Sequence, residues 1–402
     1  MLSKNDIGHS RVRQPLRPSL VRSEFGAWTS GGRTWGRIRA NPARRRKAEA
    51  TLDTAENRTG STGTQTRPPP EGTDNTPAQP QSSHRHLVTK AAAVLLLTGI
   101  SGVLLTRVAG SDGFTPLPQL LAFLPWLLVP AAAVLVATAL VGWRPGILWS
   151  LAVCAVTAFF TLPYGDASTG AKGPAVAELR VLTSNLEFGG ATDALLRTIR
   201  FERPDLIFVQ ECDHRCAAAL RRQLPGEGYA HLELDQAAGA EGSAIVSRFP
   251  LTRTPGVKGE LAMPGAVMEV DGHYVRLQLA HPMPPTPDSV GTWRSELGRL
   301  RDWAGDHSAG PAILAGDFNA TQDHAAFRGL IDAGLYDSTR LTGDSRVPSW
   351  PTSVLPPLGA QIDHVLVSRH FQAGIARFVN LGDTDHRSLI VELTLHLKPH
   401  PI

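Results

Sequence analysis

Cysteine is scarce in this chain, with 3 residues among 402. So few cysteines exclude a disulfide-rich framework of the kind that stabilises small secreted domains. Cys154 lies in an apolar run, while Cys212 and Cys216 are four residues apart on a predicted helix. A disulfide at that helical spacing is unusual, so we expect Cys212 and Cys216 to be free thiols.

The chain also lacks an even distribution of charge. Residues 1–86 hold 15 Lys and Arg against 7 Asp and Glu, whereas residues 175–402 hold 21 against 27. Residues 1–86 have no apolar periodicity and no signal-peptide core, and they are rich in Pro, Ser, Thr and Gly. We expect a disordered basic cytoplasmic tail, either simply solvated or able to bind nucleic acid or anionic lipid.

Three hydrophobic runs with almost no charge follow this tail. A membrane span takes about 20 apolar residues, or somewhat fewer where flanking Lys or Arg side chains reach the interface. The second run contains Pro125 and Pro130 but is long enough. We therefore expect residues 87–164 to form three transmembrane helices rather than buried core helices, at about 88–107, 119–142 and 146–164.

The distribution of Lys and Arg predicts the orientation in the membrane. The basic tail should remain in the cytoplasm, and three spans then place the C-terminal domain outside the cytoplasm, at the cell membrane. Arg144 in the second short loop agrees with this orientation, and Arg107 does not. With only two spans, the C-terminal domain would be cytoplasmic.

Residues 165–175 resemble a linker, and residues 176–402 alternate between short strands and helices. The strands are predicted at 179–184, 205–210, 243–249, 266–270, 273–280, 311–316, 362–368 and 388–397, and the helices at 192–200, 213–224, 290–304 and 322–333. Thr192 and Thr321 are the expected N-caps of two helices, and Asp271-Gly272 is the expected hairpin turn. The pattern predicts an α/β domain in which helices flank the sheets.

The stretch "ILAGDFNAT" ends a buried strand with two polar residues, Asp317 and Asn319. Residues i and i+2 of extended backbone point the same way, so both side chains can face one cleft while Phe318 packs behind them. Gly316 would permit a close approach of backbone. An Asx-type turn is the alternative explanation for such a sequence.

Other predicted strands begin or end with similar residues. Each supplies a carboxylate, a carboxamide or an imidazole, and together with the pair above they are Asn185, Glu211, His281, Asp317, Asn319, Asp363, Asp385 and His386. Any one of them alone would be read as a turn residue or a core histidine. Their recurrence at strand ends indicates a shared polar site.

The set, in this order, resembles the endonuclease/exonuclease/phosphatase superfamily of metal-dependent phosphoesterases. The matching stretches are "SNLEFGG", "FVQECD", "IVSRFPL", "AHPMPP", "GDFNAT", "IDHVLVS" and "TDHRSLIVEL". With the three apolar runs, the chain is most similar to the membrane-anchored bacterial branch. The resemblance implies a four-layer α/β sandwich, in which helices cover two packed β-sheets.

The resemblance and the chemistry of the side chains together imply roles. Mg²⁺, or Mn²⁺, would be bound by Glu211, with Asn185 and Asp385 contributing, because these metals prefer oxygen ligands. Asp317 would activate the attacking water and Asn319 would hold it. His386 and His281 would stabilise phosphoryl charge, Asp363 would orient His386, and Asn185 and Arg248 would contact substrate. Arg248 forming only a structural ion pair is an equal alternative.

Three functions remain open at this point. The first is a membrane-anchored phosphodiesterase or phosphatase acting on a lipid headgroup or small phosphoester. The second is a nuclease, for which the acidic balance of residues 175–402 is unfavourable. Residues between Tyr274 and Tyr336 also lack the tyrosine that nuclease members often carry, although Arg215, Arg221 and Arg222 offer local positive charge. The third is a non-catalytic binding module. No protein partner is inferred.

Overall fold

The computed structural model of the protein describes residues 81–355 and 358–397, which belong to one compact unit. Most of the predicted tail lies outside the described residues, so its disorder stays a prediction. Residues 81–86, predicted as the end of the tail, instead form the beginning of the first helix.

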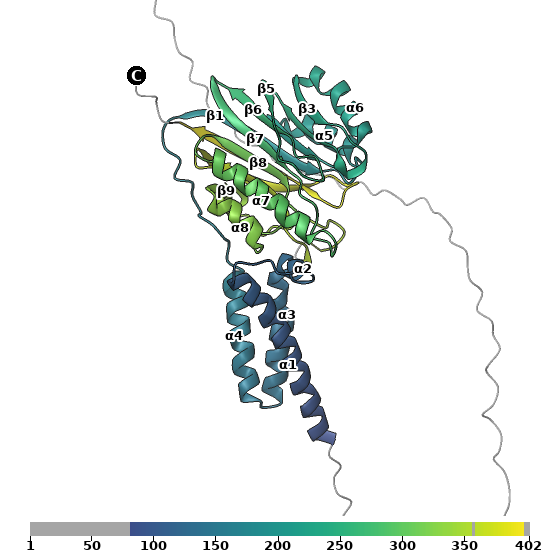
Figure 1. Ribbon diagram of the computed structural model, residues 1–402, viewed down its shortest axis with the longest axis vertical. Helices are drawn as coiled ribbons and strands as arrows, with labels where there is room; N and C mark the ends of the chain where they lie inside the picture. Colours follow the sequence, from purple (N-terminus) through teal and green to yellow (C-terminus); the bar gives the residue numbers. More distant parts are fainter. Residues whose placement is uncertain (1–80, 356–357, 398–402) are drawn as a thin grey trace, which may run out of the picture. The chain divides into compact units, whose positions relative to one another are not determined.

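The apolar runs form a small helical bundle (Figure 1). The helices α1 (Gln81–Val108), α3 (Leu128–Leu140) and α4 (Arg144–Phe160) pack against one another, and two short helices precede α3, namely α2 (Leu117–Ala122) and the 3₁₀ helix η1 (Leu124–Leu127). The predicted helix 119–142 is therefore divided, with Pro125 in the first turn of η1. Proline has no N–H to donate within a helix, which explains the break.

Among the described residues, one helical stretch is long and apolar enough to cross a membrane, His84–Val108. The stretches Leu124–Leu140 and Arg144–Phe160 are apolar but shorter than 18 residues. The prediction of three spans is therefore supported for its first member only.

The remaining residues form two six-stranded mixed sheets. The first has the order β11 (Phe371–Asn380), β12 (Arg387–His396), β1 (Ala175–Asn185), β2 (Leu206–Gln210), β4 (Ser243–Ser247) and β3 (His231–Asp235). The second has the order β5 (Leu251–Thr254), β6 (Gly265–Val270), β7 (His273–Ala280), β8 (Ala312–Asp317), β10 (Asp363–Ser368) and β9 (Leu335–Asp337).

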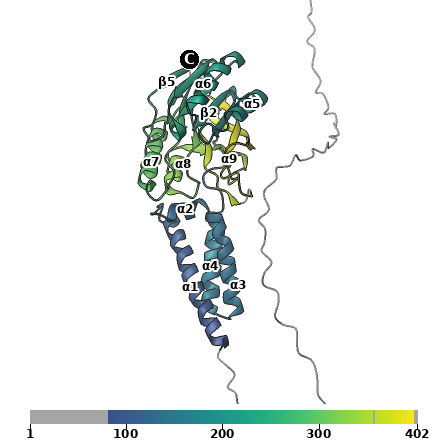
Figure 2. The same ribbon diagram turned by 90° about the vertical axis from the view of Figure 1, so that its right-hand side faces the viewer.

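The two sheets pack face to face, and helices cover their outer faces (Figures 1 and 2). A central apolar core takes alternate residues from both sheets, for example Val181 and Phe208 from the first and Leu277 and Ile313 from the second. The opposite face of the first sheet packs on α5 (Thr192–Glu202) and α6 (His214–Gln223). The second packs on α7 (Val290–His307) and α8 (Ala325–Asp332). The predicted four-layer α/β sandwich is confirmed.

The α/β domain also has shorter helical elements. They are the helix α9 (Ser338–Thr342) and the 3₁₀ helices η2 (Pro225–Glu227) and η3 (Gly239–Glu241). The strands β3, β5, β9 and β11 were not predicted. Three of them are short, and β3, β5 and most of β11 are partly exposed, so they lack a clear apolar signature.

Strand polarity brings the predicted polar residues to one edge of the sandwich. In each sheet the two central strands are parallel, β1 with β2 and β7 with β8. Parallel strands end at the same edge, and here the strands or the residues after them carry Asn185, Glu211, His281 and Asp317. The antiparallel neighbours β10 and β12 start at that edge, with Asp363 paired to Asp317 and His386 just before Arg387.

Two predicted helix caps are wrong, and one predicted turn is confirmed. The helix α5 has Ala191 at its N-cap, and the Thr192 hydroxyl donates to the carbonyl of Gly189 instead. The helix α8 begins at Ala325, three residues later than a Thr321 cap requires. Asp271 and Gly272 both have positive φ, 49° and 74°, as the hairpin turn between β6 and β7 needs.

The prediction of free thiols at Cys212 and Cys216 is also wrong, because the two form a disulfide. Asp213 caps α6, so the helix begins at His214 and Cys212 precedes it. The helical i, i+4 spacing therefore does not constrain Cys212. Cys154 is a free cysteine.

A buried group of charges, here called the junction cluster, joins the helical bundle to the α/β domain. Its members are Arg107, Asp112, Asp323, Arg328 and Arg346. The Asp112 carboxylate accepts the backbone N–H groups of Ala325 and Ala326 at 2.6 and 3.0 Å, in the first turn of α8. The loop after α1 thus caps a helix more than two hundred residues later in the chain.

Arg346 forms the other half of this connection. Its guanidinium contacts both carboxylate oxygens of Asp323, at 2.7 and 2.9 Å, and donates to the carbonyls of Phe160 and Thr161, both at 2.7 Å. These carbonyls end α4, where a cation is favoured by the helix dipole. The loop after α1 and the end of α4 are therefore both attached to the α/β domain by hydrogen-bonded charges.

Candidate active site

Asn185 lies at the centre of the predicted site, between two carboxylates. Its side-chain amide donates to Glu211 Oε1 and to Asp317 Oδ2, both at 3.1 Å. Its Oδ1 accepts the backbone N–H of Glu187 at 3.0 Å, which fixes the orientation of the amide. One buried carboxamide thereby links a carboxylate of the first sheet to one of the second.

Asp317 and Asn319 form the Asx-type turn that the sequence left open as the alternative. The Asn319 N–H donates to Asp317 Oδ1 at 2.8 Å, which is an Asx-type turn. Phe318 is fully buried in the core beneath α7 and α8, as predicted. A Cβ at Gly316 would lie 1.9 Å from the carbonyl oxygen of Ala280, so only glycine fits in this strand.

Asn319 also holds the neighbouring loop. Its amide donates to the carbonyl of Pro282 at 3.0 Å, and its own carbonyl accepts the indole N–H of Trp293 at 3.1 Å. Asn319 is therefore fixed between the strand that carries Asp317 and the segment that follows His281.

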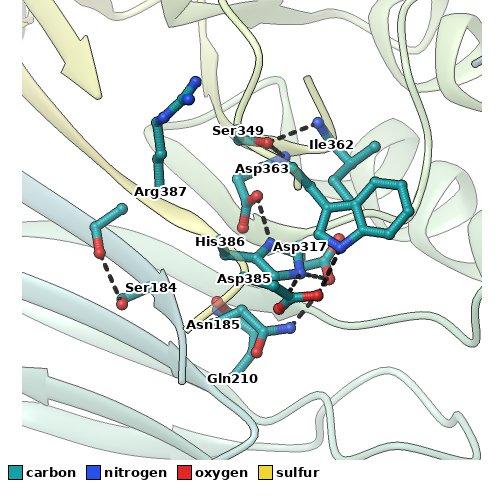
Figure 3. A network of polar contacts seen from close by, with 12 residues as sticks. Ser184, Asn185, Gln210, Asp317, Ser349, Ile362, Asp363, Asp385, His386 and Arg387 are labelled. Atoms are coloured by element: carbon teal, nitrogen blue, oxygen red, sulfur yellow. Dashed lines mark hydrogen bonds and ion pairs between the residues drawn. The ribbon is translucent and has the colours of Figure 1, made fainter. Parts of the chain in front are cut away.

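His386 lies between two buried aspartates (Figure 3). Its Nδ1 is 2.8 Å from Asp363 Oδ2, and its Nε2 is 3.7 Å from Asp317 Oδ2. Ser349 Oγ accepts the backbone N–H of Asp363 at 3.1 Å, which holds the start of β10 in place. Asp363 is therefore positioned to orient the His386 ring.

Burial and neighbouring charge shift the pKa values of these groups in different directions. Burial raises the pKa of Asp317 to about 7, although the nearby His386 opposes the rise. Burial would lower the pKa of His386, but Asp363 and Asp317 together raise it to about 10. The Asp317 carboxyl group, which loses its proton near neutral pH, thus faces a His386 imidazolium that remains protonated.

His281 behaves differently from His386. It is fully buried, and burial followed by repulsion from His386 lowers its pKa to about 3, so it is neutral near pH 7. Its Nε2 lies 3.9 Å from Glu211 Oε1, and its Nδ1 has no hydrogen-bond partner among the described residues. A neutral imidazole cannot balance the charge of Glu211.

Glu211 and Asp385 are the more exposed carboxylates of the site, with side chains 15% and 40% exposed. Glu211 accepts the backbone N–H of Phe188 at 2.9 Å, and Asp385 accepts the indole N–H of Trp350 at 2.7 Å. Asp385 Oδ1 lies 3.8 Å from His386 Nε2. The contacts described so far connect all eight predicted residues, which we call the active-site cluster.

Sequence reasoning missed Glu187, whose carboxylate accepts the backbone N–H of Asp385 at 2.8 Å. Its position two residues after Asn185 is the signal that the sequence contained. The backbone has positive φ at Glu187, so the usual alternation of side chains along a strand does not place it.

Arg248 is not part of the site. Its guanidinium donates to the carbonyl of Pro204 and to the hydroxyl of Tyr229, and it lies 4.0 Å from Asp205. It follows Ser247, which pairs with Leu206 at the start of β2, whereas Glu211 follows the end of that strand. The structure supports the alternative of a structural ion pair, and the predicted substrate contact is wrong.

A second set of residues also offers ligand atoms to a metal. Atoms of Asp317, Asp363 and His386 lie within 4.8 Å of one another. This set differs from the predicted ligands Glu211, Asn185 and Asp385. Because His386 Nδ1 already binds Asp363, we interpret the buried set as a proton-handling group rather than as a metal site.

Comparisons with known proteins agree with the fold. A model of the Endonuclease/Exonuclease/phosphatase family matches residues 182–386, about half of the chain. That match begins in β1 and ends at His386, so it includes every member of the active-site cluster. No curated protein matches the chain.

Several solved structures are similar to the chain. A humanized D. rerio TDP2 with 14 mutations has 13% identity and a TM-score of 0.45, covering 54% of this chain and 98% of that one. An endonuclease/exonuclease/phosphatase from Beutenbergia cavernae has 18% identity and a TM-score of 0.44, covering 56% and 73%. An AP endonuclease from Archaeoglobus fulgidus has 15% identity and a TM-score of 0.43, covering 53% and 98%.

These structural similarities carry no argument about substrate, because the identities and TM-scores are low. The family match rests on the sequence itself and spans both sheets. The chain therefore belongs to the endonuclease/exonuclease/phosphatase family and is a metal-dependent phosphoester hydrolase of that family.

Proposed function

We propose that the protein is a membrane-anchored, Mg²⁺-dependent phosphodiesterase or phosphatase in which Asp317 activates the attacking water. The observation that carries this proposal is the continuous series of contacts from Glu211 through Asn185 and Asp317 to His386 and Asp363. These contacts place the partly exposed carboxylate of Glu211 close to Asp317, a buried carboxyl group able to exchange a proton.

The residues present fit a hard divalent cation. Glu211 has no cationic partner among the described residues, since the nearby His281 is neutral near pH 7. Asn185 and Asp385 add further oxygen atoms, which suits Mg²⁺ or Mn²⁺. When bound, the ion would neutralise charge on the phosphoryl oxygens.

Asp317 is suited to act as the general base. A base works best when its pKa is close to the working pH, and burial brings the pKa of Asp317 to about 7. Asn185 and the backbone N–H of Asn319 donate to its two oxygens, so the carboxylate has a fixed orientation.

His386 is suited to stabilise the negative charge that develops on the phosphoryl group. Its pKa of about 10 keeps it protonated, and Asp363 fixes the ring so that Nε2 points toward Asp317 and Asp385. His281, on the other side of Glu211, would donate a hydrogen bond as a neutral ring. Such donors contribute roughly 3 kcal/mol each to stabilisation of a transition state.

The exposed faces of the helical bundle support membrane anchoring through three spans. Large apolar side chains point outward from all three helices, including Leu95, Leu105, Val136, Leu140, Leu148 and Phe159, which are 58–83% exposed. A soluble bundle would present polar side chains there. We propose that α3 and α4 span the membrane despite their length, with the catalytic domain on the extracytoplasmic side.

The Cys212–Cys216 disulfide supports this orientation. Disulfides persist in oxidising compartments and are rare in the cytoplasm. A catalytic domain held at the extracytoplasmic surface of the membrane favours a lipid headgroup or small phosphoester as the substrate.

A nuclease remains the alternative. Arg221 and Arg222 in the last turn of α6 offer local positive charge, although the acidic surplus of residues 175–402 opposes binding of a large polyanion. A non-catalytic binding module is the second alternative.

Activity of the full chain in detergent micelles separates these functions. The substrates are p-nitrophenyl phosphomonoesters and phosphodiesters, phosphatidylinositol vesicles, plasmid DNA and RNA. We expect hydrolysis of a lipid or small phosphoester that stops in EDTA and returns with Mg²⁺ or Mn²⁺. Cleavage of nucleic acid alone would favour the nuclease, and full activity in EDTA would exclude the metal. Failure on every substrate would favour the binding module.

The side of the membrane on which the catalytic domain lies can be tested separately. Alkaline phosphatase folds into an active enzyme only outside the cytoplasm, so its fusion to Ile402 should be active in cells. An inactive fusion that is present at normal levels would indicate a cytoplasmic catalytic domain.

A further inference from the structure

We propose that the Cys212–Cys216 disulfide is a positioning element of the metal site, which fixes the backbone that carries Glu211. The inference rests on the proposed function, because it takes Glu211 as a metal ligand. It assigns to the disulfide a role in ion affinity beyond the stability of the fold.

The backbone at Glu211 needs a restraint. Its φ is 55°, in the left-handed region that residues other than glycine rarely occupy. Such a conformation is strained and persists only where the surrounding structure imposes it. Here it turns the chain sharply after β2, so that the Glu211 side chain faces Asn185.

Three attachments follow within the next five residues. The Cys212 N–H donates to the carbonyl of Gly242 at 2.9 Å. A Cβ at Gly242 would lie 2.1 Å from the carbonyl oxygen of Cys212, so the two backbone segments are in close contact. The Asp213 carboxylate caps α6 by accepting the Cys216 N–H at 2.8 Å, and the disulfide joins Cys212 to the first turn of that helix.

The two sulfur atoms are placed for a structural restraint rather than for exchange with solutes. Cys212 is 1% exposed and Cys216 is fully buried, within the core that α5 and α6 form with the first sheet. The disulfide therefore ties the residue next to Glu211 to a rigid, buried part of the domain.

The same segment supports the other strained part of the site. Glu187 and Phe188 also have positive φ, 46° and 57°, and the Phe188 N–H donates to Glu211 Oε2 at 2.9 Å. A Cβ at Gly189 would lie 2.6 Å from Asp213 Oδ1, so the segments 187–189 and 211–213 are packed together. Loosening of residues 211–213 should therefore release two carboxylates, Glu211 and Glu187.

The experiment measures Mn²⁺ binding to the full chain in detergent micelles by electron paramagnetic resonance. The proteins are the wild type, the double variant Cys212→Ala/Cys216→Ala and the control Cys154→Ala, which removes the free cysteine of α4. We expect the double variant to bind Mn²⁺ about ten-fold more weakly, the effect typical of losing a residue that orients a metal ligand. The control should bind as the wild type does.

A reversible measurement covers the case in which the double variant does not fold. Because both sulfur atoms are buried, the wild type is incubated with excess dithiothreitol until local opening has exposed the S–S bond. The reagent then breaks the bond by transfer of two electrons and two protons and becomes its own cyclic disulfide. Alkylation and mass spectrometry verify the two thiols. Mn²⁺ affinity should fall by about the same factor and return after reoxidation, at a temperature far below unfolding.

The outcomes are distinct. Equal Mn²⁺ affinity in the oxidised and reduced forms, with only the unfolding temperature lowered, would show a purely structural disulfide and overturn the inference. Two free thiols in protein alkylated directly in cells would also overturn it. Failure of the oxidised wild type to bind Mn²⁺ would instead reject the metal site of the proposed function, and the inference with it.

Discussion

The active-site cluster and the junction cluster are both charged and both largely buried, and they differ in how their charges are balanced. The junction cluster has three arginines and two aspartates, and backbone carbonyls such as those of Phe160 and Thr161 accept from the surplus cation. The active-site cluster has four carboxylates and one protonated histidine. The surplus of negative charge, with no cation among the described residues to offset it, distinguishes a site that receives ligands from a structural network.

The largest effect should come from the active-site cluster. Asp317→Asn removes the proposed base and should lower kcat by roughly 10²–10⁴-fold, the usual contribution of general acid–base catalysis. The fold should be retained, because a buried carboxyl group is replaced by a neutral group of the same shape. Initial rates and circular dichroism measure the two effects.

Asp302→Asn is the matched control, because this aspartate is on α7 with a side chain 66% exposed. Its kcat should equal that of the wild type. An Asp317→Asn enzyme within ten-fold of the wild type would remove Asp317 from the role of base.

A substitution in the junction cluster should instead lower the stability of the fold and leave catalysis unchanged. Asp323→Asn leaves Arg346 and Arg107 without a carboxylate at a fully buried position, which costs about 3 kcal/mol of unfolding free energy. Activity per folded molecule should be retained, since Asp323 does not belong to the active-site cluster. Thermal unfolding in detergent measures the change in stability, and active-site titration measures the activity per folded molecule. Loss of activity at unchanged stability would mean that the junction cluster and the active-site cluster are not separate.

Asp363→Asn tests the orientation of His386. We expect a kcat lower by about 10–100-fold, a smaller loss than for Asp317→Asn, because the ring is misoriented but still present. The charge of Asp363 raises the pKa of His386, so the variant's activity should fall at a lower alkaline pH than that of the wild type. A pH profile with an unchanged alkaline limb would contradict this coupling.

The wild-type pH profile follows from the two pKa shifts. Asp317 must be deprotonated to act, so kcat/KM should decrease ten-fold for each pH unit below about 7. His386 must be protonated, so activity should decrease again only near pH 10. Rates in a series of buffers at constant ionic strength measure this profile, and a plateau that extends below pH 5 would conflict with it.

The smallest effect should come from Arg248→Ala. Its contacts are with Pro204, Tyr229 and Asp205 at the opposite end of β2, so kcat and KM should remain within about two-fold of the wild type. A large increase of KM would restore Arg248 as a substrate contact.

The active-site cluster was predictable because its signals are local. Each member adjoins a strand whose apolar residues identify it, and parallel pairing of β1 with β2 and of β7 with β8 then gathers the strand ends. The junction cluster was not predictable in the same way. Asp112 and Ala325 are 213 residues apart, and nothing near Asp112 in the sequence indicates its partner.

Other errors have a common physical origin in the backbone. The cysteine prediction assumed a helix across both residues, but the Asp213 cap delays the start of α6. Glu187 was overlooked because positive φ interrupts the alternation of side chains after β1. Regular patterns predict regular backbone, and these residues depart from it.

The cap that Asp112 supplies to α8 restricts how this protein can be rearranged. An unrelated membrane anchor fused in place of the bundle would leave the N–H groups of Ala325 and Ala326 without their acceptor. Domain exchange between relatives should therefore succeed only when bundle and sandwich are transferred together.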